Sequence, residues 1–180
     1  MSRWLGKIFL LAVVCGFFVT LADAAEVKVG EPAPDFELAG SDGKTHKLAD
    51  YAGKTVIVAW FPRAFTPGCT KECKSFAEQG KLLREFDVVY FTASCDPVEE
   101  NTKFAESLKC DYPILSDPTR AAALAYGLVA NEKGNAARKT FIIGADGKLL
   151  AVIDKVDTAG HAQQVAEKLA ELKVPAAKKE

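Results

Sequence analysis

Two cysteines, Cys69 and Cys73, lie four residues apart where an apolar, strand-like run gives way to a helical pattern. The run stops at Pro62, and the chain passes through residues 66–68, Thr-Pro-Gly, before it reaches Cys69. A cysteine in the first turn of a helix faces unpaired backbone N–H groups and the positive end of the helix dipole. We therefore expect Cys69 to have a pKa below that of a free thiol and to act as a nucleophile.

The spacing of this pair favours redox chemistry over simple cross-linking. On an ideal helix, Cα atoms four residues apart are separated by about 6.2 Å, near the upper end of the range for a disulfide. A bond between Cys69 and Cys73 would strain or unwind the first helical turn, and a strained disulfide is easily reduced. The intervening Lys71 and Glu72 are interpreted as ordinary first-turn residues without a catalytic role.

Two further cysteines, Cys95 and Cys110, are interpreted as buried free thiols. Cys95 ends a predicted strand at the same sheet edge as Cys69, whereas Cys110 follows the next helix and is expected near the opposite edge. That helix spans about 19 Å, so these two cysteines should not pair with each other. Four of the five cysteines lie after residue 24, and an even count in an oxidising compartment usually indicates structural disulfides; two such disulfides are not expected here.

The elements that position the thiols alternate between strands and helices. Their predicted order is a hairpin at 36–48, strand 54–61, helix 69–86, strand 87–95, helix 97–109, strand 112–117, helix 119–126, a hairpin of strands 138–144 and 148–156, and helix 159–172. Such alternation implies a mostly parallel sheet with helices on both faces, and the closing hairpin makes the sheet mixed. The sequence predicts an α/β sandwich of thioredoxin-like type.

The first 24 residues have the pattern of an export signal. Arg3 and Lys7 precede an apolar run at 8–21, and residues 22–24, Ala-Asp-Ala, fit a cleavage site. The run has about 14 residues, fewer than the roughly 20 that span a bilayer. We expect a signal peptide at 1–24, a periplasmic or secreted location, and one domain at 25–180 that is free of the membrane and frays at about 173–180.

The net charge and the positions of the two histidines bear on which macromolecules or metal ions the chain could bind. The formal net charge is −1 at pH 7, and no basic cluster is interleaved with aromatic residues, which argues against nucleic acid or anionic membrane as partners. Of the two histidines, His46 lies in the early hairpin and His161 begins the last helix, where a surface position is expected.

These residues resemble the peroxiredoxins of the AhpC/TSA superfamily. The family signature Pro-x-x-x-Thr-x-x-Cys stands here at 62–69, and the longer TPGCTKE resembles the bacterioferritin-comigratory, or Q-type, branch. Four further matches lie in the right order along the chain, one before this signature and three after it: GEPAPDFEL, PILSDP, AYG and RKTFIIGADGK. The resemblance implies a thioredoxin-like fold and a thiol-dependent peroxidase.

The resemblance also assigns roles to single residues. It makes Cys69 the peroxidatic cysteine, Thr66 its hydroxyl partner, Pro62 the proline that shields it, and Arg138 the catalytic arginine. Arg120 is interpreted instead as a solvated residue in the first turn of a helix.

Cys73 is the expected resolving cysteine, and Cys95 is the alternative. Many Q-type members place this cysteine five residues after the peroxidatic one rather than four, and Ala77 stands where they often have arginine.

The implied reaction needs a hydroperoxide and a thioredoxin-like dithiol as partners, and no haem, flavin or metal. The Cys69 thiolate would take an oxygen atom from the peroxide, and Cys73 would condense with the resulting sulfenic acid. The dithiol would reduce the disulfide in a protein that is a monomer or a dimer.

Three other readings are compatible with parts of the sequence. A Sco-like copper-binding protein also uses CxxxC on this fold, but it needs a third ligand, usually histidine, and residues 144–146 are Gly-Ala-Asp where that ligand would be expected. A disulfide reductase of the TlpA type needs CxxC, which the chain lacks. The Thr66 motif also has no purpose in the Sco-like reading. The third reading is a catalytically silent domain with a structural Cys69–Cys73 bridge. The peroxidase interpretation is favoured over all three.

Overall fold

A computed structural model describes residues 27–178. The expected signal peptide at 1–24 lies outside the described residues. Within 27–178, no helix has both the length and the apolar character needed to cross a membrane.

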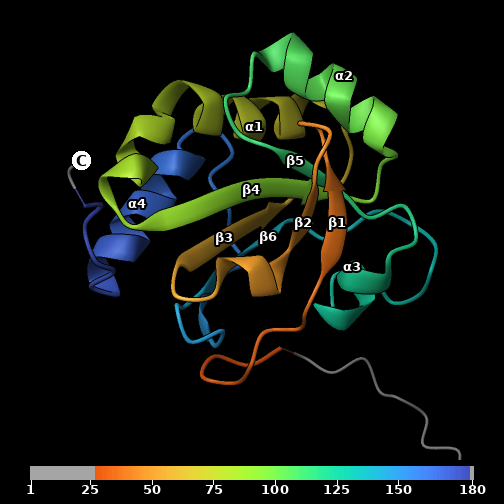
Figure 1. Cartoon of the computed structure of the whole chain (residues 1–180). Helices are drawn as coiled ribbons and strands as arrows, with labels where there is room; N and C mark the ends of the chain where they lie inside the picture. Colours follow the sequence, from red (N-terminus) through yellow and green to blue (C-terminus); the bar gives the residue numbers. More distant parts are fainter. Residues whose placement is uncertain (1–26, 179–180) are drawn as a thin grey trace, which may run out of the picture.

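Seven strands form one mixed sheet in the order β2-β1-β5-β4-β3-β6-β7 (Figure 1). The central strands β3, β4 and β5 are parallel, and every other pairing is antiparallel. The strands are β1 (Glu37–Gly40), β2 (Thr45–Lys47), β3 (Thr55–Trp60), β4 (Val88–Ser94), β5 (Ile114–Ser116), β6 (Lys139–Ile143) and β7 (Leu149–Ile153).

Helices cover both faces of this sheet, as predicted. One face carries α1, α2 and α4, and the other carries α3 and the 3₁₀ helix η1; Figure 1 shows α1 and α2 on one side and α3 on the other. The helices are α1 (Pro67–Gln79), α2 (Val98–Leu108), α3 (Ala121–Ala125), α4 (His161–Glu171), and the 3₁₀ helices η1 (Leu48–Tyr51) and η2 (Gly80–Glu85).

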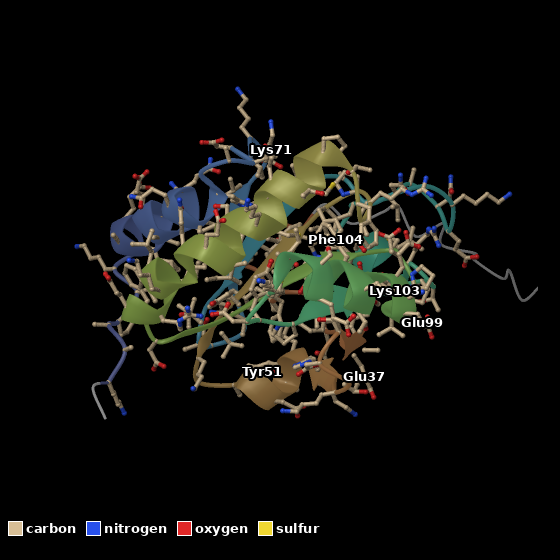
Figure 2. All side chains as sticks on the ribbon, turned by 90° about the horizontal axis from the view of Figure 1, so that it is seen from above. Glu37, Tyr51, Lys71, Glu99, Lys103 and Phe104 are labelled. Carbon is tan, nitrogen blue, oxygen red and sulfur yellow. The ribbon has the colours of Figure 1, made fainter. Side chains whose placement is uncertain are left out.

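Strand β3 separates two apolar cores. All six of its residues are buried, and successive side chains in a strand point to opposite faces. Val58 and Trp60 join the core under α3, whereas Ala59 and the following Phe61 join the core under α1, α2 and α4. On α2, Phe104 packs into this second core, while Glu99 and Lys103 lie on the outer surface (Figure 2).

The helix predicted at 69–86 is shorter than expected. It begins with Pro67 in its first turn, where proline's missing N–H is not needed, and it ends at Gln79. Gly80 then starts the 3₁₀ turn η2. A Cβ atom at Gly80 would lie 2.6 Å from the hydroxyl oxygen of Tyr90, so glycine leaves room for that side chain at the helix end.

The prediction that the chain frays from residue 173 is wrong for residues up to 177. The Asp87 N–H donates to the carbonyl of Pro175 (2.8 Å), and the Ala177 N–H donates to the carbonyl of Glu85 (2.9 Å). Val174 is also buried in the core under α4. The tail is held because its backbone pairs with the segment that leads into β4, and no local pattern in the sequence reveals that long-range pairing.

Candidate active site

Cys69 lies in the first turn of α1, directly after the loop that leaves the carboxyl end of β3. Its side chain is buried, and Thr66 is the N-cap residue of the helix. The loop is held by Asp96, whose Oδ2 accepts hydrogen bonds from the Ala64 N–H (2.8 Å) and from Ser94 Oγ (2.9 Å). The nucleophile therefore stands on a helix terminus whose preceding loop is tied to the end of β4.

Arg138 reaches the sulfur of Cys69 from the neighbouring strand. Arg138 directly precedes β6, which pairs with β3, and its Nη2 lies 3.2 Å from Cys69 Sγ. A Cβ atom at Gly68 would come within 3.3 Å of the same nitrogen, so glycine leaves room for the guanidinium. The structure thus brings into direct contact Cys69 and Arg138, to which the resemblance assigns the peroxidatic and catalytic roles.

Glu72 holds the other side of the same guanidinium. Its carboxylate is fully buried, and Oε2 is in direct contact with Arg138 Nη1. The interpretation of Glu72 as an ordinary first-turn residue is therefore wrong, whereas its neighbour Lys71 is exposed on the outer side of α1, as expected (Figure 2). A signal was available, because residues three apart on a helix share a face and Glu72 follows Cys69 by three.

His161 is the second residue whose place was wrongly predicted. Instead of lying on the surface, it is fully buried between α1 and α4. Its Nδ1 is 3.0 Å from Glu72 Oε1, and its Nε2 is 2.9 Å from Thr140 Oγ1. Burial, reinforced by the positive charge of Arg138, lowers the pKa of His161 to about 3. The imidazole is therefore neutral at neutral pH.

Cys73 lies one helical turn beyond Cys69 and is also fully buried. Its thiol donates a weak hydrogen bond to Thr92 Oγ1 (3.8 Å), and its backbone carbonyl accepts one from the Tyr112 hydroxyl (2.9 Å). Burial raises the pKa of the Cys73 thiol well above its ordinary value. Cys73 is therefore a protonated thiol in this conformation, and Cys69 and Cys73 are not bonded to each other.

The remaining cysteines lie on opposite faces of the sheet. Cys95 belongs to the core under α3, on the far side from Cys69, and burial raises the pKa of its thiol to about 11. Cys110 is only partly buried and packs against the core that contains Cys69 and Cys73. The expectation that Cys95 is better placed than Cys110 to approach the site is therefore wrong, because the sheet stands between Cys95 and Cys69.

Thr66, Pro62 and Arg120 complete the set of predicted positions. The Thr66 hydroxyl donates to the carbonyl of Arg63 (3.0 Å), so its lone pairs stay available as acceptors beside the helix start. Pro62 follows β3 in the same loop and is partly exposed. Arg120 lies apart from these residues at the start of α3, where its side chain donates to backbone carbonyls in an exposed position, as predicted for a non-catalytic arginine.

A helix-borne cysteine in contact with an arginine, on a mixed sheet with helices on both faces, defines a thiol-based oxidoreductase of the thioredoxin-like fold. Residues 29–152 match the model of the AhpC/TSA family. Over 153 residues the chain is 34% identical to peroxiredoxin Bcp of Bacillus subtilis, which covers 82% of this chain and 96% of that protein. The chain therefore belongs to the AhpC/TSA family and is a peroxiredoxin, a thiol-dependent peroxidase.

Solved structures agree with this assignment. The crystal structure of peroxidoxin BcpB from Mycobacterium tuberculosis superimposes with a TM-score of 0.74 at 32% identity, covering 81% of this chain and 98% of that one. A bacterioferritin comigratory protein from Xanthomonas campestris, described as having alkyl peroxide reduction activity, superimposes with a TM-score of 0.70 at 25% identity, covering 82% and 96%. The thioredoxin-like fold and the likeness to the Q-type branch are confirmed.

The Sco-like alternative receives no support. Neither the family model nor these relatives are copper-binding proteins by name. His46, one of the two candidate third ligands, contacts Asp42 and Tyr51 beside the core under α3. The other, His161, is engaged by Glu72 and Thr140.

Proposed function

We propose that this peroxiredoxin reduces hydrogen peroxide and organic hydroperoxides through a sulfenic acid on Cys69, which Cys73 resolves as an intramolecular disulfide. The observation that carries the proposal is the 3.2 Å contact between Arg138 Nη2 and Cys69 Sγ in the first turn of α1. A guanidinium beside the nucleophilic sulfur stands where negative charge passes from the thiolate to the departing oxygen.

In the oxidative step, the Cys69 thiolate attacks the terminal oxygen of ROOH. A sulfur–oxygen bond forms and the oxygen–oxygen bond breaks, and the electron pair of the broken bond leaves with RO⁻, which takes a proton to become ROH. Arg138 can donate to the oxygens during this transfer. The Thr66 oxygen, whose own hydrogen is used by the Arg63 carbonyl, can accept the proton-bearing end of the peroxide.

In the resolving step, the Cys73 sulfur attacks the Cys69 sulfenic acid. A disulfide forms, the sulfur–oxygen bond breaks, and water leaves with the proton of Cys73. Cys73 starts as a buried, protonated thiol, so the first turn of α1 must unwind locally before the two sulfurs meet. An external dithiol of thioredoxin type then reduces the disulfide by thiol–disulfide exchange.

The direct test is stoichiometric oxidation of the reduced protein with either hydrogen peroxide or an organic hydroperoxide. One equivalent should remove two free thiols, and thioredoxin with its reductase should restore them. Cys69→Ser should abolish peroxide consumption with little change in stability, because the role of the sulfur is nucleophilic. Peroxide consumption that persists in Cys69→Ser would show that another group carries the reaction.

We also propose that the protein is exported, to the periplasm or the exterior. The support is the basic, apolar and small-residue pattern of residues 1–24. N-terminal sequencing of the protein purified from its native host should begin at or near Ala25. A retained Met1 in the mature protein would contradict export by this signal.

A further inference from the structure

A row of buried polar side chains lies behind Arg138 and leads away from the nucleophile. From Arg138 it runs to Glu72 on α1, then to His161 at the beginning of α4, and ends at Thr140 on β6. The row therefore joins strand β6 to the two helices α4 and α1. Thr140, His161 and Glu72 are all fully buried, so bulk water does not compete for their hydrogen-bonding groups.

The proton positions in this row follow from chemistry. A carboxylate only accepts hydrogen bonds, so the ring hydrogen of His161 belongs on Nδ1, which faces Glu72, and Nε2 accepts from the Thr140 hydroxyl. The Nδ1 and Oε1 atoms are 3.0 Å apart, but their geometry is not that of a hydrogen bond. Within residues 27–178 neither atom has a hydrogen-bond partner, and because buried polar groups are costly to leave unpaired, a small turn of the ring that pairs them would be favourable.

Burial, more than the surrounding charges, favours the neutral ring of His161. Glu72 faces it from α1, Arg138 from the start of β6, and Asp157 from the loop before α4; Phe76 meets the ring edge-on, with centroids 5.0 Å apart. Burial is the largest cause and disfavours a charged ring, Arg138 acts in the same direction, and Asp157 opposes both. A neutral imidazole can still present its Nδ1 hydrogen to Glu72.

We infer that His161 is a positioning residue for peroxide reduction, acting through Glu72 and Arg138 on Cys69. The inference rests on the proposed function. The ring of His161 lies against Oε1 of Glu72, with Nδ1 at 3.0 Å, and so limits how far the carboxylate can turn while its other oxygen contacts Arg138 Nη1. This leaves Nη2 directed at the sulfur. Without His161, the carboxylate can turn about its side-chain bonds, and the guanidinium loses its fixed distance to Cys69.

The same interface offers a control for simple docking of α4. The Ala162 N–H donates to Ser75 Oγ (3.0 Å), a contact between α4 and α1 that does not involve Glu72. Ser75→Ala weakens the attachment of α4 and leaves the row from Thr140 to Arg138 intact. If His161 served only to attach α4 to α1, substitutions at His161 and Ser75 would slow the oxidation of Cys69 to a similar extent.

The experiment measures the second-order rate constant for oxidation of Cys69 by hydrogen peroxide, and in parallel the rate of alkylation of Cys69 by iodoacetamide, which needs no peroxide. His161→Leu should slow oxidation by about tenfold to a hundredfold, and Ser75→Ala less than about threefold. His161→Asn places an amide N–H where Nδ1 stood and should recover most of the rate. His161→Gln places it where Nε2 stood and should not.

A double substitution tests the route through Glu72. If His161 acts through that carboxylate, Glu72→Gln with His161→Leu should react no more slowly than Glu72→Gln alone. Additive losses in the double variant, equal effects of Ser75→Ala and His161→Leu, or equal rates for the Asn and Gln variants would each overturn the inference. A wild-type protein that is alkylated at Cys69 but inert to peroxide would instead overturn the proposed function. The role of His161 would then be judged by whether His161→Leu changes the rate of Cys69 alkylation more than Ser75→Ala does.

Discussion

Trp60 at the end of β3 and Lys139 at the start of β6 lie directly opposite each other in the antiparallel pair. This register brings Arg138, the residue before Lys139, beside the chain that leaves β3 toward Cys69. A shift of one residue in this register would send every side chain of β6 to the opposite face of the sheet. The contact between Arg138 and Cys69 is thus set by the pairing of β3 with β6 at the centre of the sheet.

Arg138→Ala should slow the oxidation of Cys69 by about a hundredfold or more, because it removes the charge nearest to the reacting sulfur. Arg120→Ala is the matched control, since Arg120 donates only to backbone carbonyls at the start of α3. Stopped-flow mixing of each reduced variant with peroxide gives the rate constants. If Arg120→Ala were the slower variant, the catalytic arginine would be misplaced.

Peroxide at one equivalent should produce a Cys69–Cys73 disulfide, which peptide mapping by mass spectrometry can identify after free thiols are blocked. Cys95→Ser should leave this product and its rate unchanged, because the sheet separates Cys95 from the site. Cys73→Ser should accumulate the sulfenic acid and over-oxidise with further peroxide. A dominant Cys69–Cys95 link would mean that the core under α3 opens during turnover.

Glu72→Ala should lower the free energy of unfolding by about 3 kcal/mol, because it leaves Arg138 and His161 without their buried partner. Lys71→Ala, one position earlier on the exposed side of α1, should change it by no more than about 0.5 kcal/mol. Urea denaturation followed by circular dichroism measures both. Similar losses in the two variants would show that Glu72 contributes only helix propensity.

His161 should make the protein less stable in acid. Its pKa is about 3 in the folded chain against an ordinary 6.5, so between these values the unfolded chain binds a proton that the folded chain does not. Stability from this residue is complete above about pH 6.5 and falls with decreasing pH by up to about 1.4 kcal/mol per unit. Urea midpoints at several pH values should therefore fall more steeply for the wild type than for His161→Asn, and parallel curves would show that His161 is protonated in the folded state.

The parts of the site that could be predicted are those encoded locally or by a motif. Cys69 was singled out because it follows a strand-to-helix turn, and Arg138 because it occupies the position of the catalytic arginine in the family that the chain resembles. His161 was missed because its burial depends on α4 packing against α1, and a histidine at a helix start has no local feature that distinguishes the two environments. The face of Cys95 was missed for a related reason. The alternation along β4 shows which residues share a face with Cys95, but not which face α1 covers.

The anchoring of the β3–α1 loop by Asp96 has a consequence for the motion that disulfide formation requires. The Ala64 N–H is held by this carboxylate and Phe76 is buried in the middle of α1, so both ends of the segment that carries the two cysteines are fixed. Unwinding is then confined to the turn between them, and the rest of α1 keeps its backbone hydrogen bonds. Oxidation should accordingly raise amide hydrogen exchange only over about residues 67–73. The hydrogen bond from the Ala64 N–H to Asp96 should stay intact throughout the catalytic cycle.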